Sequence, residues 1–175
     1  MKFIDTHCHF DFPPFTDDPV ASIAQAAAAG VERIIVPSTD ASRFARVMQL
    51  AKNYPALYAA LGLHPINIVR HHDDHLDLLA EYLQQADKDC IAIGEIGLDL
   101  YMSDPDFAKQ TRLLNAQFTL AKRFDLPVIL HSRRTHDQLA MLLRRHNLPR
   151  RGVVHGFAGS QQQAERFIQL GYAIG

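Results

Sequence analysis

The chain has 175 residues, of which 47% are hydrophobic and 21% are charged. This composition is typical of one folded domain with a buried core and argues against an intrinsically disordered chain. The formal net charge of -1 and the isoelectric point near 6.8 provide no positive field that would suit a nucleic-acid coat protein or a membrane-surface binder. Any anionic substrate must therefore be held by local charges.

The number of cysteines and the length of the apolar runs bear on the cellular location of the protein. Cys8 and Cys90 do not form the spaced framework of a disulfide-stabilised protein, so we expect free thiols. No apolar run approaches the roughly 20 residues of a membrane span, and Asp5 and His7 interrupt the start too early for a signal peptide. We expect a cytoplasmic protein with no membrane contact, and the sequence indicates no protein partner.

Short apolar runs alternate along the chain with longer segments of helical periodicity. Strands are expected at residues 3–6, 33–37, 57–63, 91–96, 127–131 and 153–155. Helices are expected at residues 19–29, 41–53, 74–86, 106–123, 135–146 and 160–170. The fourth helix has the clearest pattern, because its apolar residues form one stripe: Phe107, Leu114, Phe118 and Ala121. This alternation is typical of βαβ units and predicts a parallel sheet.

The last four residues, 172–175, begin what looks like a seventh strand. A closed (β/α)8 barrel takes about 250 residues. We therefore expect a TIM-like (β/α)8 barrel, of which residues 1–175 form a single domain with about six βα units, the C-terminal part being absent. An open doubly wound sheet is the alternative. The barrel is favoured because it lets side chains at the ends of distant strands meet over one mouth.

Potential metal ligands follow four of the expected strands: His7 and His9, Glu95, His131, and His155. The two histidines at positions 7 and 9 share one face of an extended chain. A carboxylate can bind two ions, one through each oxygen. Two divalent ions close together can polarise a substrate oxygen and lower the pKa of a bound water. The pattern therefore predicts the metal centre of a hydrolase.

Five motifs resemble those of the TatD family in order and spacing: Asp5-Thr6-His7-Cys8-His9, Gly62-Leu63-His64-Pro65, Gly94-Glu95-Ile96-Gly97-Leu98-Asp99, His131-Ser132-Arg133 and His155-Gly156-Phe157-Ala158-Gly159-Ser160. The resemblance covers nearly the whole chain. It implies a (β/α)8 barrel and metal-dependent hydrolysis of phosphodiester bonds in nucleic acid, often as a deoxyribonuclease. Gly156 stands where the family often has cysteine, and Leu100 where an aromatic residue is frequent.

The resemblance also implies a role for each matched residue. His7 and His9 would hold one divalent ion (Zn, Mg or Mn), His131 and His155 a second, and Glu95 would bridge the two as the catalytic carboxylate. His64 and Arg133 would contact the phosphate of the substrate. A late aspartate that the family uses for metal binding and water activation lies beyond the end of this chain.

Several of these residues have simpler interpretations. His64, before Pro65, also fits a cap of the turn after its strand. Asp99 fits equally a hydrogen bond to a ligand imidazole or closure of the loop after Gly97. Arg133 fits a bidentate phosphate contact at the barrel mouth, whereas the adjacent Arg134 fits a solvated charge at a helix start. The polar run at residues 71–75 is expected to be an exposed helix start rather than a second metal site.

Three functions fit the predicted centre. The first is a deoxyribonuclease of the TatD type. The second uses the same barrel and metals to hydrolyse a small amide, lactone or ester. The third is a metal-binding module without catalysis. Release of mononucleotides from an oligonucleotide separates the first from the second, and metal binding without any hydrolysis would identify the third.

Overall fold

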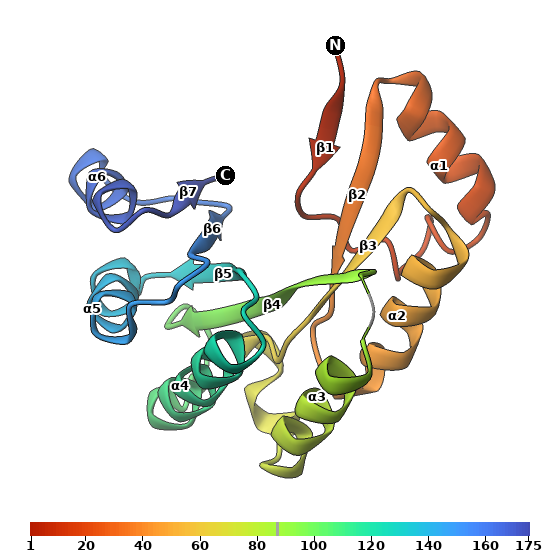
Figure 1. The fold of residues 1–175 in the computed structure, drawn as a ribbon. Coiled ribbons are helices and arrows are strands. Elements are labelled where there is room, and N and C mark those ends of the chain that lie inside the picture. The colour runs from red at the N-terminus through yellow and green to blue at the C-terminus, as the bar shows by residue number, and fades with distance from the viewer. Residues whose placement is uncertain (87) are drawn as a thin grey trace.

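The computed structural model describes residues 1–86 and 88–175. Its seven strands form one parallel sheet in chain order: β1 (Phe3–Asp5), β2 (Val31–Pro37), β3 (Leu57–Leu61), β4 (Cys90–Asp99), β5 (Val128–Arg133), β6 (Gly152–His155) and β7 (Ala173–Ile174). The sheet curls into a half-barrel with β1 and β7 as its two edges (Figure 1). The predicted barrel architecture is thereby confirmed for this part of the fold.

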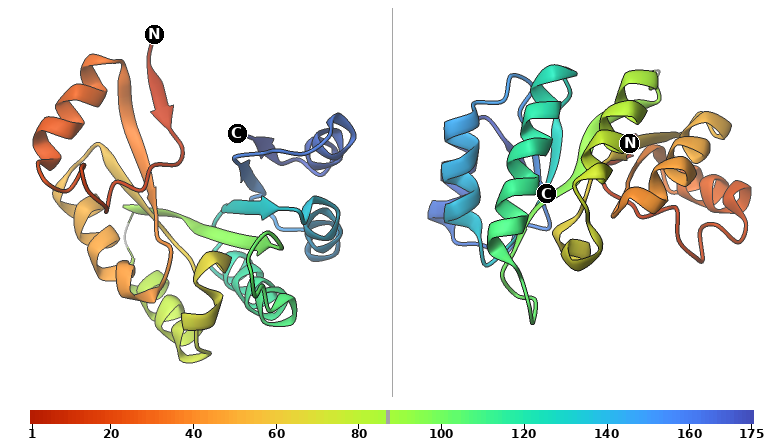
Figure 2. Two further views of the ribbon diagram at one scale, coloured as in Figure 1. Left: turned by 180° about the vertical axis from the view of Figure 1, so that it is seen from behind. Right: turned by 90° about the horizontal axis from the view of Figure 1, so that it is seen from below.

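Helices connect successive strands on the outside of the curl: α1 (Pro19–Ala28), α2 (Phe44–Asn53), α3 (Asp74–Gln85), α4 (Phe107–Arg123), α5 (His136–His146) and α6 (Gln161–Gln169). Figure 2 shows from two further directions that these helices flank the outer face of the sheet. Short 3-10 turns, Ala41–Arg43 and Pro65–Arg70, precede α2 and follow β3. None of the helices within the described residues combines the length and apolar character of a membrane span.

The main core lies between the sheet and the helices. Phe44, Phe118 and Phe167, from α2, α4 and α6, are fully buried there. The concave face of the sheet carries smaller buried side chains, with Ala92 and Ile129 in a separate cluster. Because side chains alternate between the two faces of a strand, each strand contributes to both.

Local signals begin and end the helices as expected. Asp18 accepts a hydrogen bond from the backbone of Ala21 at the start of α1. Ser160 starts α6 with a reciprocal capping box with Gln163. Gly30 and Gly171 follow α1 and α6 with φ of +91° and +85°, the conformation predicted for them.

The structure differs from the predicted bounds mainly in β4. That strand continues to Asp99, where it pairs with Arg133 of β5. Two glycines obscure this extension, because glycine is rare in strand interiors. Gly97 is needed there, since a Cβ atom at this position would lie only 1.9 Å from the carbonyl oxygen of His131. The expected exposure of residues 71–75 is wrong at His71, which is 1% exposed.

Candidate metal centre

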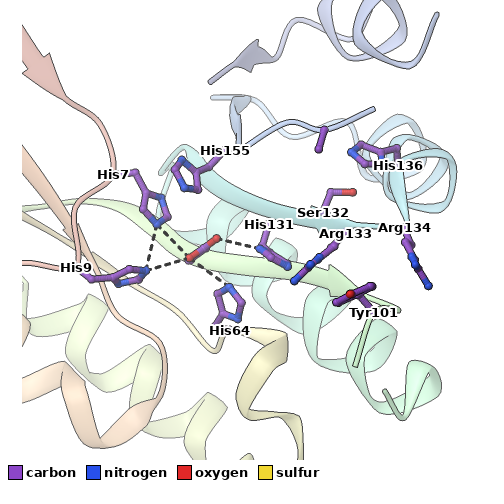
Figure 3. Close-up of a pocket in the computed structure, with 13 residues that line it drawn as sticks. His7, His9, His64, Tyr101, His131, Ser132, Arg133, Arg134, His136 and His155 are labelled. Atoms are coloured by element: carbon purple, nitrogen blue, oxygen red, sulfur yellow. Dashed lines mark hydrogen bonds and ion pairs between the residues drawn. The ribbon is translucent and has the colours of Figure 1, made fainter. Parts of the chain in front are cut away.

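Glu95 is the central residue of the candidate site. It lies in β4 with only 2% of its surface exposed. Its Oε2 lies 3.2 Å from His7 Nε2, 3.3 Å from His64 Nε2 and 3.6 Å from His9 Nε2, and its Oε1 lies 3.3 Å from His131 Nδ1. Figure 3 shows the four imidazoles directed at this common point. Segments far apart in the sequence thus meet at the carboxyl ends of the strands.

In His9 and His131, the ring nitrogen that faces away from Glu95 makes a hydrogen bond. This bond determines which nitrogen of each ring carries a proton. His9 Nδ1 lies 3.3 Å from the carbonyl oxygen of Pro37, so this nitrogen carries the proton. His131 Nε2 lies 2.8 Å from Asp99 Oδ2 and donates to it in the same way. In each neutral ring the other nitrogen then holds a lone pair toward Glu95. His9 Nε2 and His131 Nδ1 therefore each face one oxygen of the carboxylate, and each is a metal donor when it is unprotonated.

His64 has the opposite arrangement. Its Nδ1 accepts a hydrogen bond of 2.9 Å from the backbone N–H of Ile66. Burial lowers the pKa of His64, which favours the neutral ring. The proton of that ring is on Nε2, which points at Glu95 as a donor and has no lone pair for a metal. The bond to Ile66 also makes His64 the cap of the 3-10 turn, so the simpler interpretation of this residue holds as well.

His7 and His155 lie against each other on the remaining side of the centre. Their rings are stacked, with centroids 3.5 Å apart and planes within 6°. His7 Nδ1 is buried without a hydrogen-bond partner, and the backbone N–H of His7 donates to Asp5 Oδ1. His155 approaches the centre through this stack, and its ligand role stays a prediction.

The charges at the site reinforce one another. Burial opposes ionisation of Glu95, but the surrounding imidazoles, led by His131, lower the pKa of the carboxyl far below its usual range. The contact with Glu95 raises the pKa of His9. Burial also opposes protonation of His131, but its two carboxylate neighbours outweigh burial and raise its pKa. Burial lowers the pKa of His155. A permanent negative charge therefore lies at the centre of the cluster.

These residues fit a divalent metal. Within the described residues, two groups have ligand atoms that all lie within 4.8 Å of one another: His7, His9 and Glu95, and His64, Glu95 and His131. Lone pairs that face a carboxylate repel it unless a cation lies between them. Imidazole with carboxylate is a donor set that Zn²⁺ and related ions accept.

Several buried polar side chains hold the backbone at the strand ends around the centre. These contacts, which we call clamps, were not predicted from the sequence. Ser38, directly after β2, exchanges two hydrogen bonds with the backbone of Gly62, and its carbonyl accepts from the N–H of Glu95. Gln117 of α4 accepts from Leu63 N–H at 2.7 Å, just after β3. These side chains hold the ends of three strands in register around the carboxylate.

Gln110 clamps the next strand end in the same way. Its amide accepts from Asp99 N–H at 2.8 Å and donates to the carbonyl of Asp99 at 2.9 Å. Gln110 and Gln117 lie seven residues apart on the buried face of α4. The signal for both was their position in the apolar stripe of this helix, where an amide must find a buried partner.

A cavity of about 720 Å³ opens above the centre. The metal-ligand candidates line one end, and Tyr101, Arg133 and Arg134 line the other. Asp99 links the two ends, because its Oδ1 accepts from the backbone N–H of Tyr101 at 2.7 Å while Oδ2 binds His131. Both interpretations of Asp99, an imidazole partner and a loop closure, therefore hold.

Comparisons with known proteins show what this chain is similar to. A family model described as TatD related DNase matches residues 4–175. The uncharacterized metal-dependent hydrolase YjjV of Escherichia coli (strain K12) is 63% identical over 174 residues, covering 99% of this chain and 67% of that protein. The crystal structure of YjjV, a TatD homolog, aligns with a TM-score of 0.97, covering 98% of this chain and 66% of that chain. The chain thus spans about two thirds of the length of these relatives.

A more distant relative carries a more specific name. The 3'-5' ssDNA/RNA exonuclease TatD of Salmonella typhimurium is 29% identical over 163 residues, covering 92% of this chain and 62% of that protein. The similarity to YjjV, which covers two thirds of that protein, and the match of the family model over nearly the whole chain are sufficient to decide the family.

Proposed function

The chain belongs to the TatD family of metal-dependent hydrolases, and from this membership we propose that its centre hydrolyses phosphodiester bonds of DNA. The name of the Salmonella relative, an exonuclease for single-stranded DNA and RNA, supports nucleic acid as the substrate class. The predicted cytoplasmic location remains a proposal, supported by the two free cysteines, Cys8 and Cys90.

One observation carries this proposal: an imidazole nitrogen faces each oxygen of Glu95, Nε2 of His9 on one side and Nδ1 of His131 on the other. A carboxylate with a nitrogen donor on each side is suited to two divalent ions. We propose His7 and His9 for one ion, His131 and His155 for the other, and Glu95 between them. Zn²⁺, Mg²⁺ and Mn²⁺ all remain compatible with these donors.

Bound ions would supply the polarisation of a phosphoryl oxygen and the activation of water. The residues of the chain supply the rest. Asp99 keeps His131 in the tautomer that presents Nδ1 to the centre. His64 directs its Nε2 proton into the same space and can donate to a phosphate oxygen as charge develops there. Arg133, at the rim of the cavity, can hold that phosphate through its guanidinium group.

The test compares metal content and hydrolysis in matched variants of the protein expressed from its own gene. We expect about one to two divalent ions per chain by elemental analysis after gel filtration. Glu95→Ala should lose bound metal and reduce release of mononucleotides from an oligodeoxynucleotide by at least about 1,000-fold. Glu81→Ala, which removes an exposed carboxylate of α3, should change neither quantity.

Each alternative has its own result in this assay. Hydrolysis of a panel of lactones and cyclic amides, without release of mononucleotides, would replace the proposal by a small-molecule hydrolase. Metal binding without hydrolysis of any substrate would identify a metal-binding module. Unchanged turnover in Glu95→Ala would rule out the proposed centre altogether.

A further inference from the structure

Two arginines converge on one tyrosine at the end of the cavity away from Glu95. The guanidinium carbon of Arg133 lies 3.7 Å from the centroid of the Tyr101 ring, and that of Arg134 lies 4.5 Å from it. All three side chains are exposed and line the same cavity as the metal-ligand candidates (Figure 3). A cation placed over an aromatic ring is attracted by its quadrupole, so the ring holds both guanidinium groups in place.

The backbone under this cluster is firmly held. Tyr101 N–H donates to Asp99 Oδ1 at 2.7 Å, and Leu100 N–H donates to the carbonyl of Arg133 at 3.0 Å. Arg134 has φ of +58°, which is uncommon for a residue other than glycine. Such conformations persist where surrounding contacts maintain them. The ends of β4 and β5 therefore present the tyrosine and both arginines as one preformed surface.

The charge of this surface is not neutralised. Within residues 1–86 and 88–175, no carboxylate lies at ion-pair distance from Arg133 or Arg134. Asp99, whose backbone pairs with Arg133, binds His131 and the N–H of Tyr101 through its carboxylate. Two fixed, unpaired cations at one end of a cavity favour an anion with bidentate acceptors, such as a phosphate.

The position along β5 suggests which phosphate. His131 and Arg133 are two residues apart in one strand and so lie on the same face, roughly 7 Å apart along it. Arg134 follows the end of β5, and Figure 3 shows it farther from the imidazoles of the centre than Arg133. A nucleic-acid strand whose reactive phosphate lies at His131 and Arg133 would therefore bring its neighbouring phosphate toward Arg134. Both guanidinium groups contact the Tyr101 ring, so this ring positions one relative to the other.

We propose that Tyr101 and Arg134, with Arg133, form a subsite for the phosphate next to the one at the metal centre. This inference rests on the proposed function, because it takes a nucleic-acid strand as the ligand. Such a subsite makes the protein bind strands with at least two consecutive phosphates more tightly than mononucleotides. Arg134 binds the second phosphate, and Tyr101 acts as a positioning residue through the guanidinium groups.

Equilibrium binding tests the subsite without requiring turnover. The probe is a fluorescein-labelled tetrathymidylate with phosphorothioate linkages, which resist hydrolysis, in buffer containing Mg²⁺, and thymidine 5'-phosphate is the competitor with one phosphate. The parent protein should bind the tetranucleotide at least about tenfold more tightly than the mononucleotide. Arg134→Ala and Tyr101→Ala should each reduce this preference to about twofold or less. The preference should also fall as salt is raised.

Two matched variants separate the subsite from general effects of charge or folding. Arg150→Ala removes an exposed arginine from the loop before β6, at the opposite end of the strands, and should keep the preference. Tyr101→Phe retains the ring and should keep it as well. Tyr101→Phe with the low preference of Tyr101→Ala would contradict the role of the ring.

The results distinguish this inference from the proposed function. An unchanged preference in Arg134→Ala, or a parent protein that binds both ligands equally, would overturn the subsite. Hydrolysis is followed in parallel on tetrathymidylate with ordinary linkages. Absence of hydrolysis together with an Arg134-dependent preference would contradict the proposed function and leave the subsite supported.

Discussion

The two faces of the curled sheet differ in what they contain, although the same strands make both. The outer face packs large side chains against the helices, among them Phe118 and Phe167, which are fully buried. The concave face has the smaller Ala60 and Ala92 in its interior and places Glu95 near its carboxyl end. Stability therefore comes chiefly from one face and chemistry from the rim of the other. Alternation along the strands separates the two sets of side chains, and in β4 a register irregularity between Ile93 and Ile96 brings Glu95 to the same face as Ala92.

The separation is incomplete on α4. Gln110 and Gln117 belong to the outer, apolar layer by position, but their amides hold the backbone at the ends of β4 and β3. The helix layer thus contributes to the geometry of the site as well as to the core. Substitutions on one face of the sheet can show how far stability and metal binding are independent of each other.

Phe118→Ala should have the largest effect, and it should act on stability. Removing this fully buried ring from the outer face is expected to lower the free energy of unfolding by about 3–5 kcal/mol. Because the ring does not line the cavity of the candidate metal centre, the folded fraction should keep the metal content of the parent. Urea unfolding and elemental analysis measure the two quantities. Loss of metal from the folded fraction would show that the faces are coupled.

Asp99→Asn should have an intermediate effect on the concave rim. The amide can still contact His131 Nε2 but cannot stabilise its proton as a carboxylate does, so the ring loses its fixed tautomer. We expect metal affinity to fall by about 10- to 100-fold, with a much smaller change in stability. Competition with a chelator measures the affinity. Asp104→Asn, a change of the same kind at an exposed loop residue, is the control. Equal affinities for Asp99→Asn and the parent would contradict this role.

The smallest effect concerns pH and a histidine beneath the site. His71 Nε2 lies 2.7 Å from the carbonyl of His64, and burial lowers the pKa of His71. The folded state therefore binds this proton less readily than the unfolded state does. The resulting stability is fully present above the ordinary histidine pKa of about 6.5 and is lost as the pH falls through the lower pKa of the folded state.

His71→Gln should reduce this acid sensitivity, since glutamine can donate to the same carbonyl without titrating. Urea unfolding of metal-free protein between pH 5 and pH 7.5, a range chosen to bracket roughly the histidine pKa, measures the slope of stability against pH. One proton contributes at most about 1.4 kcal/mol per pH unit to this slope. The same change at the exposed His72 should leave the slope unaltered. A slope that is equal in both variants and the parent would exclude His71 as a contributor.

The fold followed closely from the sequence because its signals are local. Apolar runs and the glycines at 30 and 171 mark elements one at a time, and the structure confirms them; the caps Asp18 and Ser160 are local signals of the same kind. The extension of β4 to Asp99 was missed because it depends on pairing with β5. The burial of His71 was missed because its partner is the carbonyl of a residue in another turn.

The sequence by itself determined the family, the parallel α/β architecture and the residues available as metal ligands. Motif spacing and strand position are enough for these, since parallel strands deliver their last side chains to one edge. Only the tertiary structure decided the tautomers of His9, His64 and His131, the amide clamps from α4, and the contact of two arginines with the Tyr101 ring. These features depend on distances between elements, which periodicity within a single element does not contain.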